Sequence, residues 1–397
     1  GKLLLEASLE LAEKRCVRAL QDLGAGGLGA ATAEVAARAG AGVEMDVDPV
    51  PVRETGMNAY EILLSESQER MLAVVDPSRQ AQVEAICRAW GLTAAVVGRL
   101  VPGGRLLVRE RGRVVVDVPV EALTRRAPRY VRPAAVVPAP TWDRERVAEP
   151  RDGHQVEAIL RRLLTSPGVA SRAWIYGQFD HMVQGNTLLR PGAGDAAVLR
   201  VPGSQKAVAV AVDGNGRYAA LDARRGAALA VAEAARNVSC VGARPLGLTN
   251  GLNLGNPERS EIYGQLAQVI EGLAEACREL AIPVTGGNVS LYNETAGRPI
   301  DPTPVVGVVG VLDHPERRAV GYFRRRDHAI VLLGTPWGSL GGSEYLKRIH
   351  GMVAGPLATI YWDRERAVQQ LVRDAIAEGW IDAAHDVSEG GLLVALT

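Results

Sequence analysis

The chain has 397 residues, 47% of them hydrophobic, which is enough for two or three domains with separate cores. Lysine and arginine together number 45, as do aspartate and glutamate, so no net charge favours nucleic acid as a partner. No apolar run reaches the length of a membrane span, which argues against a membrane protein. Four scattered cysteines without a C-x-x-C pair predict reduced core thiols in a cytoplasmic protein.

In the first third of the chain, apolar residues at helical spacing predict a helix over residues 2–20, and a second helix follows a glycine-rich turn and runs to about residue 39. Strands are predicted at 43–47, 70–75 and 94–97, and a hairpin at 106–118. Five prolines between residues 127 and 150 are typical of an extended linker.

Beyond the linker, strands are predicted at 196–201, 207–212 and 304–312, and helices at 222–239 and 260–280. A third segment begins near residue 320, with a strand at 329–333, a glycine-rich turn at 338–342 and a helix at 364–378. This alternation predicts α/β or α+β layering. The predicted domains are 1–126, a linker at 127–150, 151–319 and 320–397.

The phrase Asp-x-x-x-Gly-Gly-Leu occurs twice, at residues 22–28 and 386–392, and each copy leads into an Ala/Leu-rich helical pattern. So long a period is not that of a solenoid, and it predicts a tandem chain of two similar halves. The first copy lies near the start of the chain and the second at its end. We therefore expect an internal fragment, truncated at both ends.

The first copy also matches G-x-G-x-x-G, from Gly24 to Gly29, the fingerprint of a dinucleotide site. Residues 17–20 fit a helix better than a strand, which argues against that interpretation. Both copies keep an acid ahead of glycine amides, an arrangement that can hold a cation bound to phosphate oxygens. The alternative is a plain glycine turn.

Polar segments supply the remaining candidate sites. Glu66, Ser67 and Gln68 lie in a dense polar run that can orient a small polar substrate, although a solvated loop explains the run equally well. Gly/Asn-rich loops are predicted at 213–215, 250–257 and 285–290, and together they are typical of a nucleotide crevice. No G-x-x-x-x-G-K-[ST] motif is present, which argues against a P-loop enzyme.

These phrases together resemble one family over essentially the whole chain, the large synthetase subunit of phosphoribosylformylglycinamidine synthase. The matching segments are residues 21–28, 53–57, 64–71, 232–237, 252–257, 286–294, 340–345 and 386–396. The resemblance implies an α+β / α/β fold, a tandem repeat of the two-domain unit of aminoimidazole ribonucleotide synthetase. It places the catalytic histidines and an ATP-contacting lysine in a preceding domain, so no catalytic residue is assigned here.

The resemblance implies ATP-dependent conversion of formylglycinamide ribonucleotide to the amidine, with Mg2+ and with ammonia from a glutaminase subunit. A small accessory subunit is implied as well. Alternatives are a non-catalytic nucleotide-binding or interaction fragment, or another member of the same ATP-dependent superfamily. By position, the family's magnesium ligands fall on Asp22 and Asn288, its substrate contacts on Glu66, Ser67, Gln68 and Ser290, and its ATP contacts on Asn250 and Gly287. Some members carry Asp where Asn250 stands, so the missing charge leaves the role of this residue open.

Overall fold

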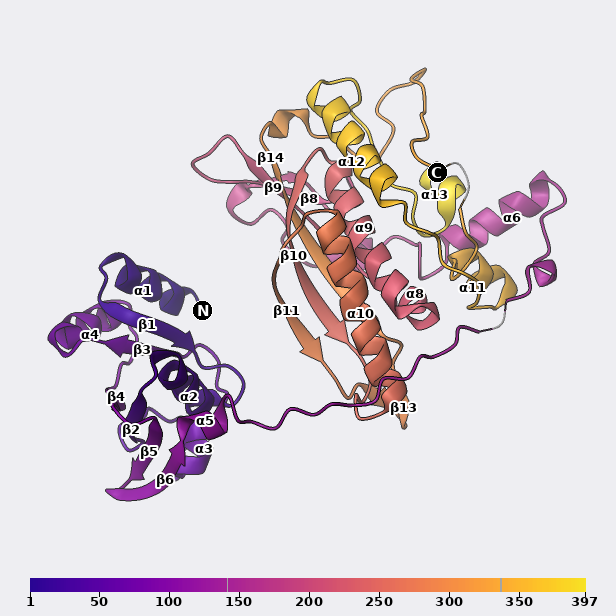
Figure 1. Cartoon of the computed structure of the whole chain (residues 1–397). Coiled ribbons are helices and arrows are strands. Elements are labelled where there is room, and N and C mark those ends of the chain that lie inside the picture. The colour runs from indigo at the N-terminus through magenta and orange to yellow at the C-terminus, as the bar shows by residue number, and fades with distance from the viewer. Residues whose placement is uncertain (141, 336–337) are drawn as a thin grey trace. The chain divides into compact units, whose positions relative to one another are not determined.

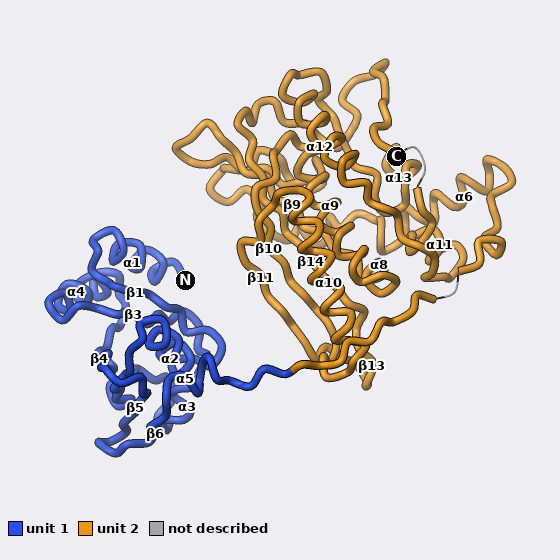
Figure 2. Tube along the Cα trace, viewed as in Figure 1, with its two compact units in different colours: residues 1–130 blue, residues 131–397 orange. Residues whose placement is uncertain are grey.

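The computed structural model describes residues 1–140, 142–335 and 338–397, which form two compact units, residues 1–130 and 131–397 (Figure 1 and Figure 2). The division between the units falls inside the predicted linker, of which residue 141 lies outside the described part. In the described ranges, no helix is both long and apolar enough to cross a membrane.

Unit 1 contains two sheets, a two-stranded antiparallel β1–β3 pair and a four-stranded sheet in the order β4-β2-β5-β6. Its elements are α1 (Lys2–Glu13), β1 (Val17–Asp22), α2 (Gly27–Ala39), β2 (Gly42–Asp46), α3 (Ala59–Leu64), β3 (Met71–Val75), α4 (Gln80–Ala89), β4 (Gly98–Val101), β5 (Arg105–Glu110), β6 (Arg113–Pro119) and α5 (Val120–Leu123). Leu28, Met45, Ile62 and Val108 belong to the core that joins α2 and α3 to the larger sheet.

Two predictions for unit 1 were wrong. The first helix ends at Glu13, and residues 17–22 form strand β1, because Arg15 takes a left-handed φ of 52° and Val17 pairs with Val75 of β3. The strand predicted at 94–97 starts only at Gly98, where a Cβ would lie 2.4 Å from the carbonyl oxygen of Glu44. Although β1 precedes the glycine-rich turn, its partner is antiparallel, so the parallel βαβ unit of a dinucleotide site is not formed.

Unit 2 is built on a six-stranded sheet in the order β11-β10-β14-β9-β8-β7, in which β10 and β11 are parallel and the other pairs antiparallel. Its strands are β7 (Thr187–Leu189), β8 (Ala197–Arg200), β9 (Ala207–Asp213), β10 (Arg244–Asn253), β11 (Val284–Ser290) and β14 (Thr303–Leu312), with a separate β12–β13 pair (Glu294–Thr295, Arg298–Pro299). Its α-helices are α6 (Gly153–Leu164), α7 (Ala173–Tyr176), α8 (Gly216–Leu221), α9 (Ala223–Cys240), α10 (Ser260–Glu279), α11 (Glu344–His350), α12 (Trp362–Ala377) and α13 (Gly391–Ala395).

Helices α9 and α10 pack against each other and against one face of this sheet (Figure 1). Asp222 caps α9 by accepting a hydrogen bond from the Arg225 amide at 2.8 Å. The alanine-rich sequence of α9 lets the two helices approach closely, and a Cβ at Gly272 of α10 would lie only 2.0 Å from the Arg224 carbonyl oxygen. Val231 and Val238 are fully buried there, and each stabilises the fold by about 1.5–3 kcal/mol.

The strand predicted at 329–333 is not formed. Ile330 and Val331 are 65% and 70% exposed, and residues 329–333 pair with no strand in the described part of the chain. High β-propensity does not make a strand without a neighbouring strand to pair with. Conversely, the polar loop predicted at 285–290 lies wholly within strand β11, and the first half of the loop predicted at 250–257 lies within strand β10.

Candidate functional site

In unit 1, the structure brings Asp22 of the glycine phrase together with Glu66 and Gln68 of the polar run. The three residues line one pocket of about 270 Å³. Strands β1 and β3 hold the two segments side by side, because Asp22 pairs with Met71 and the Leu23 amide donates to the Arg70 carbonyl oxygen at 3.1 Å. The pocket is therefore formed where two sequence motifs meet at the ends of paired strands.

Ser67, the middle residue of the predicted substrate triplet, is not among the residues that line this pocket. Its side chain is half-buried, and its Oγ lies 3.1 Å from Oγ of Ser65. Arg70 donates from Nε to the Ser67 carbonyl oxygen at 3.0 Å and holds the loop closed. Ser67 is thus placed within the loop, while Glu66 and Gln68 reach the pocket.

In unit 2, the predicted ATP contacts lie side by side on the parallel pair β10–β11. Asn250 pairs with Gly287, and a Cβ at Gly287 would lie 2.7 Å from Oδ1 of Asn250. Asn250 shares its face of the sheet with the buried Leu248 and Leu252, because alternate residues of a strand point the same way. The carboxamide of Asn250 therefore occupies the space that the glycine leaves open.

Asn288 and Ser290 follow on β11 and point to the opposite face from Gly287. Asn288 is exposed, whereas Ser290 is half-buried and accepts at Oγ a hydrogen bond from Nδ2 of Asn293 at 3.1 Å. The structure therefore gathers the four predicted residues of unit 2 at one edge of the sheet but divides them between its two faces.

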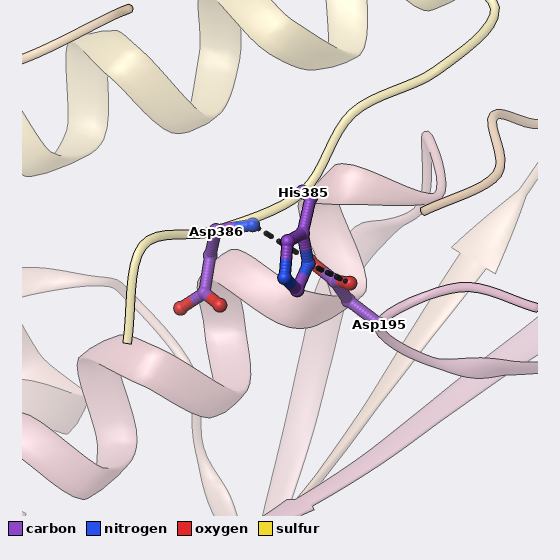
Figure 3. A group of neighbouring side chains, drawn as sticks. All are labelled: Asp195, His385 and Asp386. Atoms are coloured by element: carbon purple, nitrogen blue, oxygen red, sulfur yellow. Dashed lines mark hydrogen bonds and ion pairs between the residues drawn. The ribbon is translucent and has the colours of Figure 1, made fainter. Parts of the chain in front are cut away.

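A third group lies at the second copy of the glycine phrase (Figure 3), where the sequence analysis pointed to the acid Asp386 but assigned no role to Asp195 or His385. Asp195 accepts from the Asp386 amide at 2.8 Å, and its other carboxylate oxygen lies 2.6 Å from Nδ1 of His385. One potential ligand atom from each of Asp195, His385 and Asp386 lies within 4.8 Å of the others. The hydrogen bond to Asp195 raises the pKa of His385 above its usual value.

Two half-buried acids, Asp213 and Glu233, interact with Asp386 of this group through their charges. Burial, aided by the charge of Glu389, raises the pKa of Asp213 to about 7. Burial also raises the pKa of Glu233 to about 9, with added repulsion from the charges of Asp213 and Asp386. The guanidinium of Arg236 offsets part of this negative charge. Burial alone would lower the pKa of Arg236. The charges of Glu365, Asp386 and Glu233 outweigh burial, so the pKa of Arg236 lies above its usual value.

The arrangement fits a divalent cation. Asp386 is only 7% exposed, and its Oδ2 has no hydrogen-bond partner among the described residues, although Arg236 lies 3.6 Å away. An orphaned buried carboxylate oxygen is costly unless a cation satisfies it. Carboxylates suit Mg2+, and the added imidazole also suits Zn2+ or Mn2+. The repeated phrase was the one sequence signal for Asp386, while Asp195 is brought in only by the tertiary fold.

The two copies of the phrase have the same local structure. In each copy the aspartate lies four residues before a glycine that is the N-cap of a helix and has a left-handed φ. Gly26, with a φ of 73°, precedes α2, and Gly390, with a φ of 86°, precedes α13. Their surroundings differ, since Asp22 is exposed and Asp386 is buried.

The fold and these sites define a class of protein built from AIR synthase domains. The family "AIR synthase related protein, N-terminal domain" matches residues 193–312, and "AIR synthase related protein, C-terminal domain" matches residues 1–110 and 325–397. Each segment matched by the C-terminal domain family contains one copy of the glycine phrase, which confirms the predicted repeat of an AIR-synthetase-like unit.

Sequence identity to curated relatives points to one kind of protein within this class. The chain is 55% identical to the phosphoribosylformylglycinamidine synthase subunit PurL of Thermomicrobium roseum and 50% identical to that of Moorella thermoacetica, covering 100% of this chain and 54% of each relative. The chain is thus built from AIR synthase related domains and is similar, over its whole length, to part of the phosphoribosylformylglycinamidine synthase subunit PurL. It spans about half the length of the curated relatives it matches.

Solved structures of Thermotoga maritima proteins share the fold. PurL complexed with FGAR has a TM-score of 0.69 and 30% identity over 95% of this chain and 54% of that one. PurL complexed with ATP has a TM-score of 0.68 and 29% identity over 95% and 56%. The structure described as PurLQS has a TM-score of 0.65 and 33% identity over 80% and 50%.

Proposed function

We propose that this chain forms part of an ATP-dependent C–N ligase that converts formylglycinamide ribonucleotide to formylglycinamidine ribonucleotide in purine biosynthesis. The observation that carries the proposal is the pocket in which Asp22 meets Glu66 and Gln68, within a chain about half identical to PurL relatives along its whole length. Three polar side chains converging from two motifs are typical of a site for a small charged substrate.

ATP and Mg2+ are the proposed cofactors, and complexes of T. maritima PurL with ATP and with FGAR support the choice of nucleotide and substrate. Asp22 in unit 1 and Asn288 in unit 2 would each hold a Mg2+ ion of their own unit through a side-chain oxygen, and such an ion would offset the charge of ATP phosphates. Gln68, Ser67 and Ser290 would orient the ribonucleotide, while Asn250 and Gly287 would receive ATP. The second acidic centre would hold a further cation through Asp195, His385 and Asp386.

The proposed division of the chain is an AIR-synthase C-terminal-type domain at 1–126, a linker at 127–150, a nucleotide-binding-type domain at 151–319 and a second C-terminal-type domain at 320–397. Ammonia would come from a glutaminase subunit, with a small accessory subunit in the same synthase. The T. maritima structure described as PurLQS supports a multi-subunit assembly. A cytoplasmic location suits the four cysteines, all of which are free thiols.

Calorimetric titration of the chain with formylglycinamide ribonucleotide tests the substrate site. We expect Gln68→Ala to weaken binding by roughly tenfold to a hundredfold, because a hydrogen bond to a charged phosphate contributes about 1.5–3 kcal/mol. Gln82→Ala, on the surface of α4 and away from the pocket, is the matched control. A chain that binds ATP but not the ribonucleotide would instead favour a nucleotide-binding or interaction module.

A further inference from the structure

Glu66 makes its hydrogen bond to the protein itself. Its Oε1 accepts from the Gly26 amide at 2.9 Å, although the two residues are 40 positions apart. Gly26 is the N-cap of the 13-residue helix α2, and as a glycine it has no side chain with which to cap the helix. Amides at a helix start lack helical partners and favour a negative charge, so Glu66 supplies the missing cap from the neighbouring loop.

The backbone of the loop that carries Glu66 packs closely against the first residues of α2. A Cβ at Gly27 would lie 2.2 Å from the Ser65 carbonyl oxygen and 2.9 Å from that of Leu63. Arg70 closes the loop from the other side by donating to the carbonyl oxygens of Ser65 and Ser67. The turn that carries Asp22 and the loop that carries Gln68 are thereby joined into one structural piece.

We propose that Glu66 is a positioning residue, which fixes the turn after Asp22 against the Ser67–Gln68 loop through the Gly26 amide. For this positioning role, Oε1 of Glu66 matters as a hydrogen-bond acceptor for the Gly26 amide, and the negative charge of the side chain is not required. Loss of the acceptor frees the turn and weakens cation binding at Asp22, although Asp22 itself is unchanged. The part of this inference that concerns the cation rests on the proposed function, whereas the contact with Gly26 does not.

The experiment compares Glu66→Gln, which keeps an acceptor oxygen, with Glu66→Ala, which does not. Glu34→Ala, an exposed acid on the same helix, is the control. The rate of amide hydrogen exchange at Gly26 measures the protection that its hydrogen bond to Glu66 provides. Mn2+ titration followed by electron paramagnetic resonance reads the cation, and the component that disappears in Asp22→Asn is assigned to this turn.

We expect Gly26 to exchange about tenfold faster in Glu66→Ala than in the wild-type chain, and Glu66→Gln to stay close to wild type. The Mn2+ affinity of the Asp22 component should fall about tenfold in Glu66→Ala only. Equal losses in the Gln and Ala variants would overturn the inference, because charge would then be the property that matters. An unprotected Gly26 in the wild-type chain would overturn it too.

A wild-type chain with a protected Gly26 but no Asp22-dependent Mn2+ signal would overturn the link between turn and cation, together with the metal role in the proposed function. In Glu66→Ala, Mn2+ binding could be lost while ribonucleotide binding stays undiminished. This result would separate the claim about the turn after Asp22 from the claim about the Ser67–Gln68 loop. The positioning role at the turn would then stand, and the link to the substrate loop would fail.

Discussion

At the scale of single residues, three acidic side chains of unit 2 interact through their charges in a largely desolvated environment. Asp213, Glu233 and Asp386 all have raised pKa values, and burial is the largest cause for each. Burial disfavours the charged forms of these carboxyls, so their ionisation lowers stability as the pH rises unless a cation neutralises them. These residues are therefore expected to make stability depend on both pH and divalent cations.

For Glu233, the direction in which stability changes with pH can be stated. Its pKa rises from an ordinary value of 4.5 to about 9 on folding, so the folded chain binds more protons than the unfolded chain between these values. The stability contributed by the neutral carboxyl is fully present below about pH 4.5 and is lost as the pH rises towards 9. Glu233→Gln mimics the neutral form and should flatten this fall by at most about 1.4 kcal/mol per pH unit.

The measurement is urea unfolding between pH 5 and 8.5 in the presence of a chelator, with the exposed Glu271→Gln as control. Equal pH slopes in the Glu233 variant and the wild-type chain would show that Glu233 titrates alike in the folded and unfolded states.

Gly287 offers a test of the β10–β11 edge. Alanine there would place Cβ 2.7 Å from Oδ1 of Asn250, so the carboxamide or the edge strand must move, at a cost of about 1–3 kcal/mol. Gly286→Ala is the matched control, since a Cβ at that position meets nothing within 4 Å in the described structure. Thermal unfolding should separate the two variants by several degrees, and equal melting temperatures would show that Asn250 does not pack over Gly287.

At the scale of elements, the long amphipathic helices were predictable to within one or two residues. Helices α9, α10 and α12 each carry a repeating apolar face over four or more turns, and α9 also begins at the capping residue Asp222. Shorter elements depend on partners that are distant in sequence, which is why β1 was mistaken for helix and residues 329–333 for strand. The candidate sites also depended on partners distant in sequence. Local motifs predicted Asp22 and Gln68, whereas only the tertiary fold brings Asp195 to Asp386.

The start of α2 provides the element-scale prediction. Gly27 and Gly40 both have left-handed φ values, 53° and 63°, so alanine at either position carries a backbone strain of about 1–2 kcal/mol. Only at Gly27 does the new Cβ also meet backbone, 2.2 Å from the Ser65 carbonyl oxygen. We expect Gly27→Ala to lower the free energy of unfolding of unit 1 clearly more than Gly40→Ala does. Equal losses in chemical denaturation would mean that the polar loop does not press on the helix.

At the scale of the whole molecule, the two units should separate on limited proteolysis. Arg125, Arg126 and Arg129 are exposed just before the boundary, whereas further along the chain the Ala135 amide donates to the Ser260 carbonyl oxygen at 3.0 Å. Trypsin should therefore cut first at residues 125–129 and leave two resistant fragments. Mass spectrometry identifies the cuts, and early cleavage inside either unit would contradict the division at residue 130.

The central claim is that these residues serve as part of a formylglycinamidine-forming synthase, and a segment exchange tests it most directly. Replacing the matching segment of the T. roseum PurL subunit with this chain should preserve ATP- and ammonium-dependent conversion of formylglycinamide ribonucleotide, measured as substrate-stimulated ADP release. Gln68→Ala in the exchanged segment should raise the KM for the ribonucleotide roughly tenfold to a hundredfold, because Gln68 lines the pocket. A folded chimera that binds ATP but releases no ADP in response to the ribonucleotide would contradict the account.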